Sequence, residues 1–409
     1  MTPNIDADAF FADLDELNRR GEGPRPGINR IAFSPADLAG RAYLEGRMTA
    51  LGMDVRRDAA GTTVARLEGS EPGLPALALG SHTDTVPEGG RYDGALGVTA
   101  ALACARALVD AGIHLRHPLK VLNFVAEEAT MSGGTFGSRA MAGLLEQASV
   151  EGPAWDGRSV RSHLEDAGIN AGRVVEARRR RGEVEAYLEL HIEQGGELDR
   201  AGVPLAIVEG IVGIRRYAIV VEGTANHAGT TPMDARDDAL LAALPIVAAV
   251  RDVAVEHGIV GTVGTLQVLP GSSNVVPGRV EMSAEMRTLD DALLDRAEDT
   301  LAARVASGRG TMSRLSAKAP VPSSPRVMGA VEAALEGMDE PWRRMPSGAG
   351  HDAMCMAAIT DVAMLFVPSR DGVSHSPHEH TERRHCLLGA TALLCALLQL
   401  DREAGGPKR

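Results

Sequence analysis

The chain has 409 residues and a formal net charge of −13, with 44% hydrophobic, 24% charged and only 3% aromatic residues. This length exceeds one ordinary core and predicts two or three domains, and the composition excludes a fibrous or largely disordered protein. The negative charge excludes nucleic acid as a partner, because phosphate binding depends on clustered cations.

The N-terminal sequence MTPNIDADAFFADLDELNRR lacks the cationic start and the apolar stretch of a secretory signal. No apolar run is long enough to cross a bilayer. Four cysteines are scattered along the chain, so we expect free thiols in a reducing compartment and no thiolate metal site. Together these features predict a cytoplasmic protein with no membrane partner.

The first half of the chain predicts alternating strands and helices. Ser34 and Pro35 precede an amphipathic helical pattern and provide a typical helix start. The elements expected after this helix are strands 53–55, 63–67 and 76–81, helix 98–108, strand 119–126 and helix 139–145. This alternation indicates an α/β layered domain.

From about residue 213 the expected order becomes βαββαβ, the order of a ferredoxin-like unit. Its elements are strand 217–221, helix 239–257, strands 264–268 and 279–286, helix 292–306 and strand 312–317. The Pro-rich stretch 319–325 is interpreted as a return linker. We therefore expect a catalytic domain in two parts, residues 1–212 and 326–409, with an inserted domain over residues 213–325.

The most informative segment is GSHTDTVPEGGRYDGALGV, residues 80–98, which places His82, Asp84 and Asp93 in a loop after a buried strand. Ligands of α/β enzymes bind beyond the carboxyl ends of strands. If the strand continues, His82 and Asp84 share one side, so Asp84 could accept one ring N–H and leave the other nitrogen for a metal. Taken alone, H-x-D is more typical of a surface loop.

Several other segments are equally weak when taken singly. They are VAEEAT with Glu127 and Glu128, LELHIEQG with His191 and Gln194, ANHAGTTPM with His227, SSNVVPG with Asn274, AEMRTLD with Arg287, SGAGHDAM, and VSHSPHEHT with His375. In combination they have the order and approximate spacing of the hydantoinase/carbamoylase family of metal-dependent amidohydrolases, which the chain resembles over almost its whole length. This family lies within the aminoacylase-like metallopeptidases, and it includes N-carbamoyl-L-amino acid hydrolases, allantoate amidohydrolases and β-ureidopropionases.

The resemblance implies an α/β di-metal hydrolase domain with an inserted ferredoxin-like lid and dimerisation domain. It also implies two divalent metal ions bridged by Asp93, one held by His82 and His191 and the other by Glu128 and His375. Imidazole and carboxylate ligands without thiolates suit zinc, with manganese, cobalt or nickel as alternatives. Two such ions would lower the pKa of a bound water enough to supply hydroxide near neutral pH.

The resemblance also assigns roles to residues around the metals. Glu127 is the expected general base, which takes a proton from the metal-bound water and delivers it to the leaving nitrogen. In the family, the His matching His227 reaches in from the partner subunit as an oxyanion donor, which implies a homodimer. Asn274 and Arg287 match positions that grip the substrate carboxylate, with a surface ion pair as the alternative for Arg287. Gln194 is expected beside the reacting group.

Two departures from the family pattern affect the expected substrate. Members usually continue the Glu pair as EEGSRF, whereas this chain has EEATMSGGTF, with Met131 at the position of the Arg. We therefore expect a less polar pocket or one shaped for another leaving group. His378 and His380 crowd His375, and either could contact a metal, although solvated or supporting roles fit better.

The expected activity is metal-dependent cleavage of a C–N bond in an N-carbamoyl amino acid or related ureido acid. The loss of the Arg leaves open a hydrolase of N-acyl amino acids or small amide conjugates, which would release an amine but no ammonia. A noncatalytic metal-dependent binding protein is a third reading. Glu127 argues against it, because a binding protein needs no base beside its metal ligands.

Overall fold

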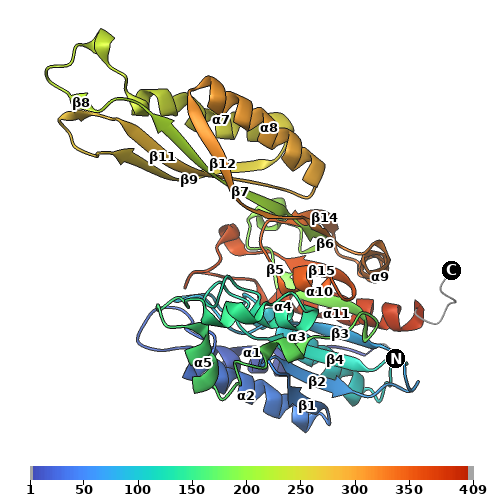
Figure 1. Ribbon diagram of the computed structural model, residues 1–409. Helices are drawn as coiled ribbons and strands as arrows, with labels where there is room; N and C mark the ends of the chain where they lie inside the picture. Colours follow the sequence, from blue (N-terminus) through green and yellow to red (C-terminus); the bar gives the residue numbers. More distant parts are fainter. Residues whose placement is uncertain (1–2, 404–409) are drawn as a thin grey trace. The chain divides into compact units, whose positions relative to one another are not determined.

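The computed structural model describes residues 3–403, which form two compact units (Figure 1). Unit 2 is the continuous segment Gly210–Pro322, and unit 1 combines the residues before and after it. The boundaries expected at residues 213 and 325 each lie three positions further along the chain than these. None of the helices in the described part of the chain combines the length and hydropathy needed to span a bilayer.

A nine-stranded sheet forms the centre of unit 1, with the order β1-β2-β4-β3-β5-β15-β6-β13 and with β14 beside β6. Its strands are β1 (Asp54–Arg57), β2 (Thr63–Leu67), β3 (Ala76–His82), β4 (Leu119–Phe124), β5 (Val184–Ile192), β6 (Leu205–Ile211), β13 (Val321–Pro322), β14 (Trp342–Ser347) and β15 (Asp361–Val367). The central pairs β4–β3, β3–β5 and β5–β15 are parallel. All seven residues of β3 are buried, as expected for a parallel strand covered on both faces.

The long helices of unit 1 pack against this sheet. One large core contains side chains of α1 (Ala7–Arg19), α2 (Pro35–Ala50), α3 (Ala95–Asp110), α9 (Pro325–Glu336) and α11 (Arg383–Glu403). The remaining helical segments are α4 (Phe136–Ala142), η1 (Gln147–Glu151), α5 (Val160–Asp166), η2 (Val174–Ala177), α6 (Glu197–Ala201), α10 (Asp352–Met356) and η4 (Arg370–Gly372). Helix α2 begins as predicted, because the Ser34 hydroxyl accepts the Asp37 N–H and Pro35 occupies the first turn.

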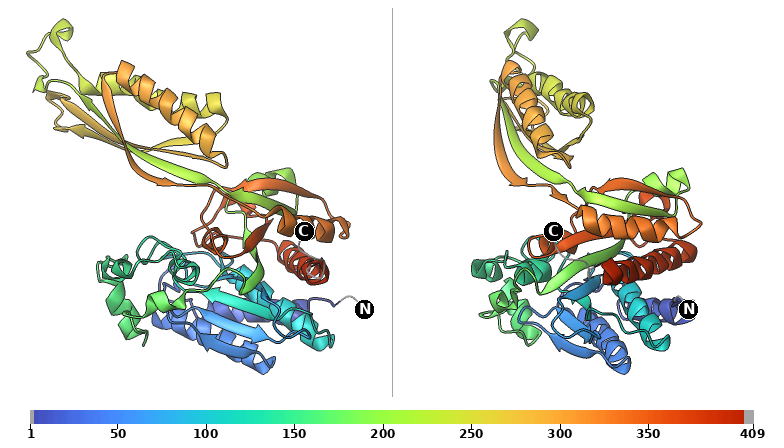
Figure 2. Two further views of the ribbon diagram at one scale, coloured as in Figure 1. Left: turned by 45° about the vertical axis from the view of Figure 1, so that its right-hand side comes forward. Right: turned by 90° about the vertical axis from the view of Figure 1, so that its right-hand side faces the viewer.

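Unit 2 has a four-stranded antiparallel sheet of order β12-β7-β11-β9, with two helices on one face (Figure 2). Its main elements are β7 (Gly213–Glu222), α7 (Ala239–His257), β9 (Val260–Leu269), β11 (Arg279–Thr288), α8 (Asp291–Ser307) and β12 (Gly310–Lys318), with η3 (Met233–Ala235) between β7 and α7. A two-stranded ladder of β8 (Asn226–His227) and β10 (Val275–Val276) continues from the β7–β11 pair. This is the βαββαβ element order expected from the sequence.

Most predicted elements differ from the structure by a few residues at their ends, and three of these differences have a local explanation. The second buried strand ends at Phe124 rather than residue 126, because Ala126 adopts a positive φ of 49°. Helix α4 starts three residues before the expected position, at Phe136, whose ring belongs to a buried cluster. The expected linker 319–325 contains strand β13, and Pro325 already opens α9, a position that suits proline.

Candidate active site

His82 is the last residue of β3, and a backbone carbonyl rather than a carboxylate orients its ring. Its Nδ1 lies 3.0 Å from the carbonyl oxygen of Asp84 and 3.8 Å from the Asp84 carboxylate. The expectation that the Asp84 carboxylate orients His82 is therefore wrong, because the strand ends at His82 and its alternation does not reach Asp84. That carboxylate instead accepts the backbone N–H groups of Glu127 and Glu128, at 3.2 and 3.1 Å.

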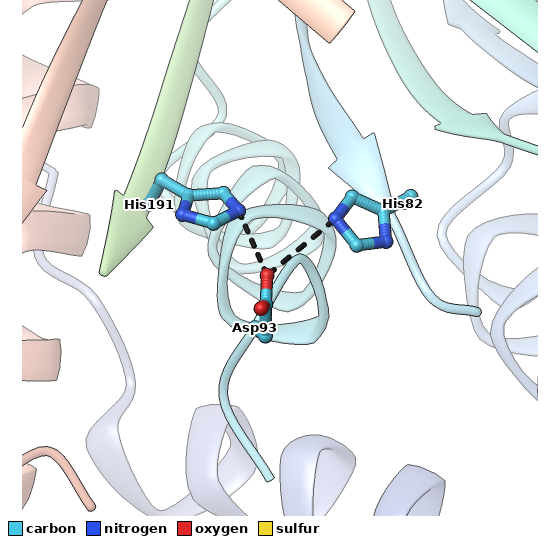
Figure 3. A group of neighbouring side chains, drawn as sticks. All are labelled: His82, Asp93 and His191. Atoms are coloured by element: carbon cyan, nitrogen blue, oxygen red, sulfur yellow. Dashed lines mark ion pairs between the residues drawn. The ribbon is translucent and has the colours of Figure 1, made fainter. Parts of the chain in front are cut away.

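Asp93 lies between two sets of side chains. Its Oδ1 is 3.6 Å from His82 Nε2 and 3.1 Å from His191 Nε2, and both rings face it from strand ends (Figure 3). Its Oδ2 is 3.1 Å from His375 Nε2, and that nitrogen is 3.5 Å from Glu128 Oε1. The two oxygens of one carboxylate thus face different sets of donor atoms.

These residues fit a pair of divalent ions. In each of the groups His82–Asp93–His191 and Asp93–Glu128–His375, one donor atom per residue lies within 4.8 Å of the others. Two ligands bound about 2.1 Å from one tetrahedral ion stand about 3.4 Å apart, which is close to the separations observed here. The donors are imidazole and carboxylate groups, which suit zinc and its first-row neighbours.

The protonation pattern also suits metal binding through Nε2. The carbonyl of Ile192 lies 2.9 Å from His191 Nδ1, as that of Asp84 does at His82, so each Nδ1 carries a proton and Nε2 is left for a metal. Burial opposes protonation of His191, but Asp93 prevails and raises its pKa to about 9. A cation bound there would therefore displace a proton.

Gly94 allows the Asp93 loop to pass directly beneath His82. Its φ is +61°, and a Cβ at this position would lie 2.4 Å from His82 Nε2. A larger residue would therefore push the ring away from Asp93. The same glycine is the N-cap of α3.

Glu127 is close to the Asp93–His82 pair, with its Oε2 3.7 Å from His82 Nε2. Burial, followed by the nearby charges of Asp352 and Glu128, raises the pKa of Glu127 well above the ordinary value. A carboxyl group with a raised pKa suits a general base that works near neutral pH.

Gln194 contacts the same carboxylate through its side-chain amide. Its Nε2 donates to Asp93 Oδ2 at 2.8 Å, while its backbone N–H donates to Ser369 Oγ at 3.0 Å. The residue has a positive φ of 58° at the end of β5, so the backbone turns its side chain toward Asp93.

Sequence reasoning missed several buried residues around these ligands. Glu189 accepts the Ser81 hydroxyl at 2.7 Å, and the His351 ring centroid is 4.5 Å from that of His191. Glu379 accepts the backbone N–H groups of Tyr92 and Asp93. All three lie in segments that carry the family resemblance, LELHIEQG, SGAGHDAM and VSHSPHEHT. An ionisable residue between apolar residues or metal ligands is the sequence feature that could have identified them.

The two departures from the family pattern have structural explanations. Met131 is fully buried in a cluster with Phe33 and Phe136, and its backbone pairs with Ala154. Its side chain therefore packs into this core, and no cation replaces the family's Arg at position 131. A less polar pocket stays a prediction. His378 is exposed, whereas the His380 ring packs edge-on against Tyr92 at 5.9 Å, which is a supporting position beside Asp93.

His227 and Asn274 lie together in unit 2. His227 Nδ1 accepts the N–H groups of Gly229 and Thr230, at 3.0 and 3.2 Å, so its Nε2 carries the proton and can donate it to a ligand. The Asn274 carbonyl accepts the N–H of Ala228, which places it beside His227.

Arg287 lies at the other end of this sheet and pairs with Glu285 at 2.6 Å. Arg279 adjoins the β8–β10 ladder, and Arg287 lies eight positions further along β11, which corresponds to about 26 Å of extended strand. Asn274 and Arg287 of one chain therefore cannot grip the same small carboxylate, contrary to the simplest reading of the sequence.

A sequence model of peptidase family M20/M25/M40 matches residues 78–399. The chain belongs to this family. This M20 chain is 38% identical over 404 residues to the N-carbamoyl-L-amino acid amidohydrolase of Geobacillus stearothermophilus, covering 97% of this chain and 99% of the relative. It is 33% identical over 399 residues to the allantoate amidohydrolase of Bacillus subtilis (strain 168), covering 95% and 96%.

Solved structures agree with these relatives. The M20 chain is similar to an amidase of the hydantoinase/carbamoylase family from Burkholderia multivorans, with a TM-score of 0.91, 33% identity and coverage of 98% and 99%. The predicted kinship with that family is confirmed, as is a mixed α/β hydrolase that acts on non-peptide C–N bonds.

Proposed function

We propose that this M20 protein is a homodimeric amidohydrolase that uses two divalent metal ions to cleave a C–N bond of an N-carbamoyl amino acid or related ureido acid. The observation that carries the proposal is Asp93, whose two oxygens face separate donor groups within reach of Glu127. The substrate class follows the names of the relatives, an N-carbamoyl-L-amino acid amidohydrolase and an allantoate amidohydrolase.

Asp93 Oδ1 with His82 and His191 would hold one ion, and Asp93 Oδ2 with Glu128 and His375 would hold the other. Zinc suits this set best, with manganese, cobalt and nickel as alternatives. When bound, the ions would polarise the scissile carbonyl and activate the attacking water.

Glu127 would remove the proton of the attacking water and pass it to the leaving nitrogen. The Asp84 carboxylate supports this role, because it accepts the backbone N–H of Glu127 and fixes the turn from which the side chain extends. The raised pKa of Glu127 gives it a proton affinity suited to both steps.

His227 would donate its Nε2 proton to the developing oxyanion in the active site of the partner subunit. Arg287 would bind the substrate carboxylate in the active site of its own chain, as a bidentate guanidinium. The separation of about 26 Å along β11 supports this division of labour, since one small substrate cannot contact both residues of the same chain. Asn274 would accompany His227.

The surface of unit 2 supports a dimer. Helix α7 exposes Leu241, Leu244 and Val255 by 59%, 52% and 68%, and the edge strand β9 exposes Val260 by 62%. An apolar helix face next to an unpaired strand edge is a surface that a second copy would cover. We propose that these residues lie in the dimer interface.

The N-acyl amino acid alternative rests on the loss of the family's Arg at position 131, and the names of the relatives favour the ureido class over it. A panel of N-carbamoyl amino acids, allantoate, ureidopropionate and N-acyl amino acids tests the proposal, with ammonia and amine release followed for metal-replete protein. We expect ammonia from ureido compounds, and none from the Glu127→Gln variant. Amine release from acyl compounds alone would overturn the substrate class, and turnover unaffected by a chelator would overturn the metal mechanism.

A further inference from the structure

Glu379 is a buried carboxylate that connects two ligand loops far apart in the sequence. Only 3% of the residue is exposed. Its Oε1 accepts the backbone N–H groups of Tyr92 and Asp93, at 2.8 and 3.1 Å. Its Oε2 accepts the hydroxyl of Ser374, at 3.0 Å, one residue before His375. These three partners are neutral groups, so none of them forms an ion pair with the Glu379 carboxylate.

The same hydroxyl connects Glu379 to the Asp93 side chain. Ser374 Oγ is 3.2 Å from Asp93 Oδ2, the oxygen that faces His375, and it can donate its single proton to either carboxylate. One buried group thus touches the backbone of Asp93 and, through Ser374, the oxygen that His375 approaches.

His375 needs such support from its loop. Its side chain is 49% exposed, and its backbone adopts a positive φ of 52°. Few packed neighbours therefore hold the ring, and its distance from Asp93 depends on how the loop is anchored.

The Asp93 loop is shaped to admit this carboxylate. A Cβ on Gly90 would lie 2.0 Å from the Cδ and Oε1 atoms of Glu379. Only glycine at position 90 leaves the space that the carboxylate occupies.

We infer that Glu379 is a positioning residue, which holds the Asp93 and His375 loops at the spacing that the Asp93–Glu128–His375 metal site needs. The inference rests on the proposed function, because it assumes that this donor group binds a divalent ion. Groups that orient metal ligands typically contribute about 10-fold to 100-fold to metal affinity.

Metal-free full-length protein titrated with Zn²⁺ in a calorimeter tests this inference. His375→Ala identifies which binding event belongs to the His375 site. We expect Glu379→Ala to weaken that event about 10-fold to 100-fold. Glu379→Gln should recover most of the affinity, because its amide oxygen can accept the same two N–H groups. Gly90→Ala should reproduce the Glu379→Ala loss while keeping the carboxylate in the chain.

Asp401 provides a matched control. Its carboxylate is also buried and also accepts two consecutive backbone N–H groups, those of Arg116 and His117, at 3.0 and 2.9 Å. Asp401→Ala should lower the thermal midpoint and leave Zn²⁺ affinity unchanged.

The outcomes separate the inference from the proposed function. If wild type binds two ions and His375→Ala loses one, but Glu379→Ala and Gly90→Ala bind as wild type does, the positioning role is wrong and the metal site stands. If Asp401→Ala loses as much Zn²⁺ affinity as Glu379→Ala, a general loss of stability explains both losses and the inference is overturned. If wild type binds fewer than two ions, the proposed function itself fails. Should Glu379→Ala not fold, Gly90→Ala and Glu379→Gln decide the question.

Discussion

Mixed dimers of two inactive variants, Glu127→Gln and His227→Ala, should recover activity that neither variant has alone. Glu127 lies beside His82 in unit 1, whereas His227 and Arg287 lie at opposite ends of the unit 2 sheet. If His227 serves the partner's site, a mixed dimer contains one site with both defects and one site with neither.

The size of this recovery follows from counting sites. Random pairing of the two variants in equal amounts makes half of the dimers mixed, and half of the sites in those dimers are intact, so activity should reach about 25% of wild type. Mixed dimers isolated with two affinity tags should reach about 50% of wild-type activity per dimer.

Co-expression followed by the ammonia assay measures this recovery. The matched control pairs Glu127→Gln with His82→Ala. Both residues lie in unit 1 and belong to the same active site of their own chain. Each site of that mixed dimer keeps one defect, so no recovery is expected. A mixture of Glu127→Gln and His227→Ala no more active than its components would refute the placement of His227 across the interface.

Three further predictions concern catalysis, stability and assembly. Glu127→Gln should keep the metal content measured by atomic emission and lose turnover by about 10²-fold to 10⁴-fold; unchanged turnover would remove Glu127 from the mechanism. Burial raises the pKa of Asp58 to about 6, so its contribution to stability is present below about pH 4 and lost as the pH rises through 6. Urea unfolding should show that Asp58→Asn removes this part of the pH dependence, at most about 3 kcal/mol, and parallel wild-type and variant curves would contradict it. Leu241→Glu places a charge on the exposed face of α7 and should shift the protein toward monomer in light scattering, whereas Asp252→Glu on the same helix should not.

Much of the fold was predictable because strand and helix patterns dominate locally. Helix α7 and strand β2 have the predicted bounds, and β3 extends one residue beyond its prediction. The candidate metal ligands were also predictable from the sequence, because each one ends or follows a buried strand or lies in a loop rich in glycine and histidine. Parallel strands then bring their carboxyl ends to one edge, as with His82 on β3 and His191 on β5.

What the sequence could not provide was the direction of individual side chains. Asp84 was expected to orient His82, yet a strand end at His82 turns its carboxylate toward Glu127 and Glu128. The segment with Met131 was expected next to the catalytic base, yet the Met131 side chain itself packs into a core, and its backbone pairs with Ala154. The Glu379 contact joins loops almost 300 positions apart, and no local pattern contains that information.

The chain enters and leaves unit 2 through neighbouring strands, with Ile211 paired to Val321 and Gly210 paired to Pro322. Paired residues of antiparallel strands have Cα atoms about 5 Å apart, so the long segment begins and ends at almost one point. Such a segment can be exchanged for another of any length without changing the register of the strands that precede and follow it. The arrangement makes unit 2 an insertion whose length can change while strands β3 and β5, which carry His82 and His191, keep their pairing.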